Sequence, residues 1–170
     1  MKFLIGMLVV LCAALCGAQE GFAPPPPPAE LKQVAFLLGN WEGKETYTFG
    51  EMKSEGTGNH HIQMALRGRF LESHYKAKSG FMGDSEGRLL LTYDTAAKKF
   101  RSWWYDSSDS GNMEMEGNVE GDSLVMISKP TSIPGMGVET FRATFTKKGD
   151  NRLTFVLALK AGDKWEPMIE

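Results

Sequence analysis

From Trp41 onward, the chain consists of short segments rich in β-branched and aromatic residues, separated by turn-forming residues. Such segments are typical of β-strands, and no long helical pattern interrupts them. The predicted strands occupy residues 41–49, 57–66, 69–77, 86–93, 99–106, 113–119, 123–128, 138–147, 152–159 and 164–170. The hairpin-like turns between them are Arg67-Gly68, Asp94 to Lys98, Glu120 to Asp122 and Lys148 to Asn151. About ten strands joined in this way predict an all-β fold, a single antiparallel up-and-down β-barrel, because closure removes exposed edges.

The first 18 residues are predicted to lie outside the barrel. Lys2 precedes an apolar run, and Cys16-Gly17-Ala18 supplies small residues at its end, which is the pattern of a secretory signal peptide cleaved after Ala18. The run is shorter than the roughly 20 residues that a membrane span needs. A lipoprotein anchored at Cys16 is the less favoured alternative. We therefore expect a secreted or periplasmic protein with no transmembrane span after cleavage.

Residues 19–29 are predicted to be a proline-rich linker, since the five consecutive prolines from Pro24 favour an extended polyproline II rod. A docking ligand for an aromatic groove is the alternative interpretation. Residues 30–170 then form the barrel domain. Its first segment is expected to be a short helix that ends at Gly39 and packs on or plugs one end of the barrel. The apolar residues at helical spacing are Leu31, Val34, Ala35 and Leu38.

Cysteine usage and charge restrict the class of protein. Both cysteines, Cys12 and Cys16, lie in the predicted signal, so the domain must be held by its own core rather than by disulfides. The chain carries 19 basic and 21 acidic residues, a formal net charge of −2. This balance provides no strong basic field, so nucleic acid is not expected as a partner.

The alternation of side chains along a strand predicts which residues face the barrel interior. The expected inward sets are His60, Ile62, Met64 and Leu66 on 57–66; Trp41, Gly43, Glu45, Tyr47 and Phe49 on 41–49; and Phe100, Ser102, Trp104 and Asp106 on 99–106. Trp103 and Tyr105 then point outward. Their apolar surface needs a cover, which either the N-terminal helix or a homodimer interface would supply. The irregular segment 129–137 is expected to form a flap over one barrel mouth.

Several motifs are specific enough to compare with known families. They are LLGNWEGK at 37–44, LRGRFLESHYKAK at 66–78, LLLTYDTAAKKFRSWWYDSSDSG at 89–111, Glu116-Gly117, and KWEPMIE at 164–170. Together they resemble the DUF1579 family of exported bacterial proteins, which implies a lipocalin-like barrel of unassigned activity. The resemblance matches the family tryptophan to Trp104. Thr92 replaces a usual Gly, and the last strand stops at Glu170 where the family continues, so we expect weakened pairing with strand 41–49.

Histidine chemistry is the main catalytic alternative. Nitrobindin-like barrels, which are distantly similar, take their haem ligand from C-terminal strands, whereas this chain has no histidine after His74. Adjacent His60 and His61 point to opposite faces of a strand and cannot form a metal pair. A zinc cluster of His60, His74 and Glu72 depends on strand register and is less favoured than a buried, hydrogen-bonded His60. We expect no metal and no cofactor.

Other catalytic and binding motifs point away from an enzyme. The oxygen-rich segment from Asp106 to Gly111 lacks the spacing of an EF-hand and is expected to be a strand-end turn. The sequence has no nucleophile elbow and no glycine-rich phosphate loop, so no catalytic residue is assigned.

The favoured function is binding of a small apolar or aromatic molecule inside the barrel. The predicted cavity residues are Trp41, Tyr47, Phe49, His60, Ile62, Met64, Tyr93 and Trp104. Inward methionines suit an adaptable cavity or an ordinary core. The alternative is a structural or interaction module of the cell envelope, with a filled barrel and a partner surface at Trp103 and Tyr105. A haem- or zinc-dependent enzyme is less favoured.

Overall fold

The computed structural model describes residues 24–80, 83–108, 110–133 and 136–170, which excludes the predicted signal peptide. Two short 3-10 helices and twelve strands are formed by these residues. The helices are η1 (Ala29–Leu37) and η2 (Leu66–Gly68). The strands are β1 (Gly39–Phe49), β2 (Met52–Ala65), β3 (Phe70–Ser79), β4 (Gly83–Asp94), β5 (Lys99–Asp106), β6 (Met113–Glu120), β7 (Ser123–Ser128), β8 (Thr131–Ile133), β9 (Gly137–Glu139), β10 (Phe141–Lys147), β11 (Leu153–Ala161) and β12 (Lys164–Ile169).

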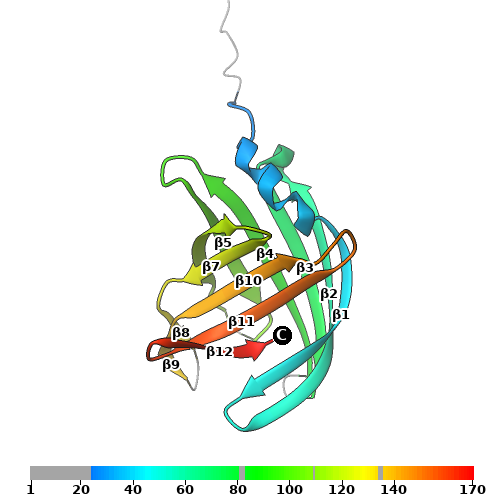
Figure 1. The fold of residues 1–170 in the computed structure, drawn as a ribbon, viewed down its shortest axis with the longest axis vertical. Helices are drawn as coiled ribbons and strands as arrows, with labels where there is room; N and C mark the ends of the chain where they lie inside the picture. The colour runs from blue at the N-terminus through cyan, green and yellow to red at the C-terminus, as the bar shows by residue number, and fades with distance from the viewer. Residues whose placement is uncertain (1–23, 81–82, 109, 134–135) are drawn as a thin grey trace, which may run out of the picture.

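Ten of these strands close into one antiparallel barrel, as the sequence predicts (Figure 1). Apart from the closing pair of β1 and β12, neighbouring strands in the barrel are also neighbours in the chain, except that the β8–β9 hairpin is inserted between β7 and β10. The barrel is closed where Tyr47 of β1 pairs with Ile169 of β12. At the same place the backbones of Thr46 and Glu170 exchange two hydrogen bonds, of 2.8 and 3.0 Å.

The segment between β7 and β10 is more regular than the sequence suggests. It was expected to be an irregular flap followed by one strand over 138–147, whereas the structure divides it into β8, β9 and β10. The division falls at Thr140, after which the Phe141 amide donates a 2.8 Å hydrogen bond to the Ser128 hydroxyl. The β8–β9 hairpin lies at the end of the barrel opposite η1 (Figure 1).

The N-terminal helix is a 3-10 helix that covers one end of the barrel (Figure 1). Its buried residues are Leu31, Val34 and Leu37, spaced by three, which matches the three residues per turn of this helix type. An α-helical stripe would instead have buried Ala35, which is exposed. The helix contacts β4 and β10, and its buried side chains join the interior cluster. The expectation that it covers the outer face of β5 is therefore wrong.

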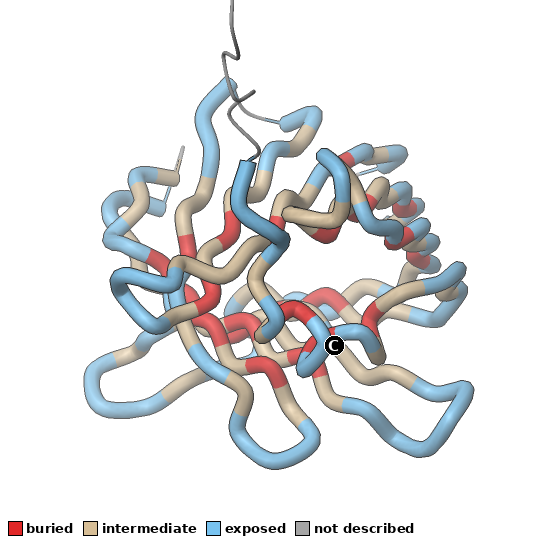
Figure 2. The backbone as a smooth tube through the Cα atoms, turned by 90° about the horizontal axis from the view of Figure 1, so that it is seen from above, coloured by how far each residue is buried: buried red, intermediate tan, exposed pale blue. Residues whose placement is uncertain are grey.

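The core lies inside the barrel, and buried positions alternate with less buried ones most clearly along β5, β7 and β10 (Figure 2). The end near η1 is tightly filled: Phe100 is 1% exposed, and its ring meets that of Tyr93 edge-on at 5.1 Å. Leu66, predicted to face inward, is 64% exposed because the chain leaves the strand there with a positive φ of 49° and turns through η2. Within the described residues, no helix has the length and apolar character needed to cross a bilayer.

Candidate functional site

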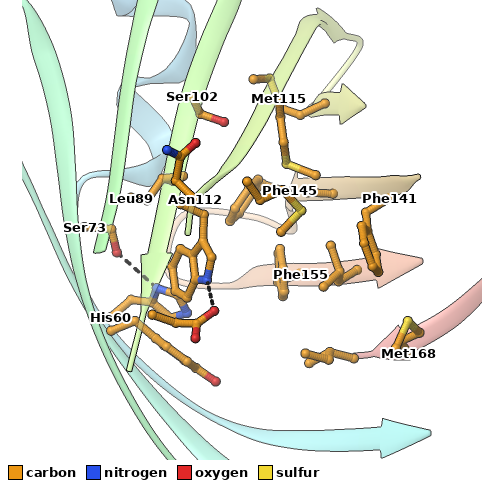
Figure 3. Close-up of a pocket in the computed structure, with 18 of the residues that line it drawn as sticks. His60, Ser73, Leu89, Ser102, Asn112, Met115, Phe141, Phe145, Phe155 and Met168 are labelled. Atoms are coloured by element: carbon orange, nitrogen blue, oxygen red, sulfur yellow. Dashed lines mark hydrogen bonds between the residues drawn. The ribbon is translucent and has the colours of Figure 1, made fainter. Parts of the chain in front are cut away.

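The barrel is not completely filled by its own side chains. A cavity of about 450 Å³ occupies the interior between η1 and the opposite end of the barrel. Exposed residues at that opposite end also line it, including Glu86, Asn112 and Met136. Figure 3 shows that the lining has two chemically different sides, with His60 and Ser73 on one and Phe141, Phe155 and Met168 on the other. The volume is within the usual range of small-molecule sites, roughly 300–1,000 Å³.

The strands from β6 to β12 provide an apolar wall. Its larger side chains are Met113, Met115, Met126, Phe141, Phe145, Phe155 and Met168. The rings of Phe145 and Phe155 pack with their centroids 4.8 Å apart. Unbranched thioether side chains adapt to different shapes more easily than branched ones, so this wall can adjust to an apolar ligand.

The strands β1 to β3 place a carboxylate and two phenols together on the opposite wall. Tyr47 and Tyr75 both donate hydrogen bonds to Oε2 of Glu45, the one from Tyr75 at 2.7 Å. The two phenolic oxygens are 3.2 Å apart. Burial is the main cause that raises the pKa of both tyrosines, to about 12 for Tyr47, and the hydrogen bonds to Glu45 add to the effect. Both phenols therefore stay protonated and keep donating across the physiological pH range.

His60 lies beside this cluster and is held by Ser73. Its Nδ1 is 3.1 Å from the Ser73 hydroxyl, and its ring packs against that of Tyr75 in a tilted arrangement with centroids 4.5 Å apart. Burial lowers the pKa of His60 to about 4, so the imidazole is neutral near pH 7.

The surroundings of the Ser73–His60 pair do not favour a nucleophilic role. In the described part of the chain, no carboxylate is hydrogen-bonded to His60 to orient it, as the third member of a catalytic triad would. Ser73 is itself only 2% exposed. An imidazole with such a low pKa is also a weak general base at neutral pH.

Trp104 of β5 continues the group of aromatic side chains formed by His60 and Tyr75. It lies toward the end of the barrel opposite η1, which is the open end of the cavity. Its ring is 5.6 Å from that of Tyr75, and its Nε1 donates a 3.1 Å hydrogen bond to Asp106. The carboxylate of Asp106 also accepts a 2.8 Å bond from the Ser108 amide, which fixes the turn after β5. This supports the strand-end turn expected for the segment from Asp106 to Gly111.

Two glycines create the space that these side chains occupy. A Cβ on Gly58 would lie 1.9 Å from Oε1 of Glu45, and a Cβ on Gly87 would lie 2.2 Å from the ring of Trp104. Each glycine faces a cavity residue on a nearby strand. The absence of a side chain at these positions lets Glu45 and Trp104 lie against the barrel wall instead of filling its centre.

The structure brings together five of the eight predicted cavity residues, and these five line the cavity. They are Tyr47, Phe49, His60, Ile62 and Trp104. The other three, Trp41, Met64 and Tyr93, do not line it and lie near the η1 end of their strands. Side-chain alternation predicts which face of a strand a residue is on. It does not predict which part of the barrel interior is filled by side chains and which part is left as a cavity.

Each of these three residues has different surroundings at the η1 end. Trp41 donates a 2.8 Å hydrogen bond from Nε1 to the Leu37 carbonyl at the end of η1. Tyr93 packs against Phe100. Met64 is 41% exposed because η2 begins two residues later and turns the chain away.

The site also contains four polar partners that were not among the predicted site residues: Glu45, Ser73, Tyr75 and Asp106. Glu45 and Asp106 were placed on inward faces, and that was the signal that could have identified them. Tyr75 and Ser73 share the face of buried Leu71. They become site residues because the register of β2 against β3, which pairs His60 with Tyr75, places both of them beside His60. This register is fixed by the folded barrel and cannot be inferred from one strand.

Trp103 and Tyr105 lie on the outside of β5. Arg101 is 5.5 Å from the centre of the Trp103 ring and partly covers it, while Tyr105 is 43% exposed. A partner surface or homodimer interface at these residues stays a prediction.

The three candidate zinc ligands lie on different sides of the barrel wall. His60 lines the cavity, whereas His74 pairs with His61 on the outer face, and its Nε2 lies 3.3 Å from a carboxylate oxygen of Glu72. In the described ranges, no group of three or more His, Cys, Asp or Glu residues is placed to hold a metal ion.

The described residues form a closed antiparallel up-and-down barrel with an internal cavity, so their fold belongs to the all-β class of closed barrels. Residues 26–170 match the model of the family described as "Protein of unknown function (DUF1579)", and the chain belongs to this family. The match confirms the resemblance drawn from the sequence motifs. No curated protein matches the chain.

Proposed function

We propose that this protein binds a small apolar or aromatic molecule inside its barrel. The observation that carries the proposal is the cavity of about 450 Å³, in a barrel whose interior could instead have been filled by side chains. Its lining is mainly apolar, with a few polar groups concentrated on one side, as in many small-molecule sites.

The arrangement along the barrel axis supports a defined orientation of the ligand. Near η1 the cavity is lined by Leu37, Ile62 and Leu91, so this part accepts an apolar group. The hydrogen-bonding side chains of Glu45 and Asp106 lie farther toward the open end. A molecule with an apolar body and a polar group at one end would satisfy both regions.

Ligand binding is tested by purifying the protein from its host and analysing it by native mass spectrometry. Solvent extraction then releases any bound molecule for identification. We expect a bound apolar molecule whose occupancy falls strongly in Trp104→Ala, because Trp104 lines the cavity. Trp103→Ala, on the outer face of the same strand, is the matched control and should retain it. Equal occupancy in the two variants, or no extracted molecule together with no uptake of added apolar probes, contradicts the proposal.

We also propose that the protein is exported. The support is the signal-like sequence of residues 1–18 and the proline-rich linker of residues 19–29, of which residues 1–23 lie outside the described part of the chain. N-terminal sequencing of the protein from its host should give a mature chain that starts at Gln19. A chain that retains residues 1–18 in the cytoplasm contradicts export.

A further inference from the structure

The polar wall of the cavity combines a carboxylate with a continuous group of aromatic rings. Tyr75 is the centre of this group: its hydroxyl donates a hydrogen bond to Glu45, and its ring packs against that of His60 and lies 5.6 Å, between centroids, from that of Trp104. Aromatic faces carry partial negative charge and attract cations, and a carboxylate adds a full negative charge. These are the two components from which proteins build sites for ammonium groups.

The charges that line the cavity all have one sign. Glu45, Glu86 and Asp106 line it, and within the described residues no Lys or Arg does. Glu86 is paired at 3.1 Å with Lys76, which is not part of the lining, so Glu45 and Asp106 are the carboxylates that count most toward a ligand. His60 is neutral near pH 7 because burial lowers its pKa to about 4. An anionic headgroup would therefore meet carboxylates and no cationic side chain of the lining, which is unfavourable where solvent is partly excluded.

Glu45 is held in place and still has capacity to bind a ligand. Both tyrosine hydrogen bonds go to Oε2, and in the described part of the chain Oε1 has no hydrogen-bond partner. A carboxylate has about four acceptor positions, so two phenols do not saturate it. Gly58 makes room for Oε1 against the wall, since a Cβ there would overlap it.

We propose that the cavity is selective for a molecule with an ammonium head on an apolar body, an inference that rests on the proposed binding function. The head lies against Glu45, Tyr75 and Trp104 in the outer half of the barrel. The body extends toward Ile62 and Leu91 near η1. A primary amine would donate hydrogen bonds to Glu45, and a quaternary ammonium would use the aromatic faces and the charge alone.

The test compares four probes with the same octyl chain and different heads: octyltrimethylammonium, octylamine, octanol and octanoate. Affinities are measured by calorimetry on the wild-type protein at pH 7. We expect the two cations to bind about tenfold more tightly than octanol, and octanoate to bind most weakly. This comparison needs no variant, so it does not depend on whether a variant folds.

The role of Glu45 is tested with Glu45→Gln. In this variant the affinities of the two cations should fall to within about threefold of that of octanol, while the affinity of octanol itself is unchanged. Glu42→Gln changes an exposed residue of the same strand and should keep the preference for cations. If octanol or octanoate binds as tightly as the cations in the wild type, the ammonium inference is wrong and the binding function stands. If none of the four probes binds, both fail.

Discussion

The phenol of Tyr75 donates a 2.7 Å hydrogen bond to the carboxylate of Glu45, a residue that precedes it by 30 positions. The bond crosses β2 and links β1 to β3 inside the barrel. It is the contact around which Tyr47, His60 and Trp104 are arranged. This bond should therefore contribute to the stability of the barrel.

Tyr75→Phe should lower the free energy of unfolding by about 1.5 kcal/mol, because a hydrogen bond to a charged group is lost within the barrel. Urea unfolding measures the change. Tyr105→Phe removes the same hydroxyl from an exposed outward tyrosine and should change stability by less than about 0.5 kcal/mol. If the two variants lose the same stability, the Glu45–Tyr75 bond does not stabilise the barrel.

His60 should make the protein lose stability in mild acid. Its pKa is about 4 in the folded protein and about 6.5 in an unfolded chain, so below pH 6.5 the unfolded state binds the extra proton. The resulting loss begins near pH 6.5 and reaches about 3 kcal/mol at pH 4 by linkage.

The measurement is the difference in unfolding free energy between pH 7 and pH 4, determined for the wild type and for His60→Gln. The variant should lack the loss of stability that His60 causes. His61→Gln, which changes the adjacent exposed histidine, is the matched control. An identical pH dependence in all three proteins would show that His60 is not desolvated in the folded state.

Gly87→Ala should displace Trp104 from the barrel wall. The new Cβ would lie 2.2 Å from the indole, and a large ring has little freedom to move aside. We expect a changed near-UV circular dichroism signal and weaker probe binding, by at least about tenfold. Gly43→Ala adds a methyl group where no atom lies within 4 Å and should leave both unchanged. Unaltered binding in Gly87→Ala would mean that Trp104 does not shape the site.

The helix η1 should be an integral part of the barrel. Leu37 is 1% exposed and lines the inner end of the cavity, so Leu37→Ala should cost about 3 kcal/mol of stability. Leu66→Ala changes a leucine that is 64% exposed and should cost less than about 0.5 kcal/mol. Similar small effects of both changes in urea unfolding would show that η1 covers the barrel end without holding it.

The positions of the strands, and which face of each strand points into the barrel, could be predicted from the sequence because both depend on local properties. On β5, alternation placed Phe100, Ser102 and Trp104 inside, where Phe100 and Ser102 are buried and Ser102 and Trp104 line the cavity. The turn residues located most strand boundaries within a few positions. One exception is β2, which begins at Met52 and not at residue 57, because the hairpin with β1 continues through a polar stretch.

Features that depend on several strands at once could not be predicted. The pairing of His60 with Tyr75 requires the register of β2 against β3. The exclusion of Trp41 from the cavity depends on where η1 ends, because its indole bonds the Leu37 carbonyl. Both are set by the packing of the whole barrel and leave no periodic signal in the sequence.

The most direct test of the account is a methyl NMR titration of the methionines with octanol, a neutral apolar probe. Signals of Met115, Met126 and Met168, which line the cavity, should shift together and saturate at one probe per chain. Signals of Met52 and Met64, which are 61% and 41% exposed and lie outside it, should stay unchanged. Each signal is assigned by a Met→Leu change. Absence of saturable shifts at the cavity methionines, or shifts confined to Met52 and Met64, would contradict a binding site inside the barrel.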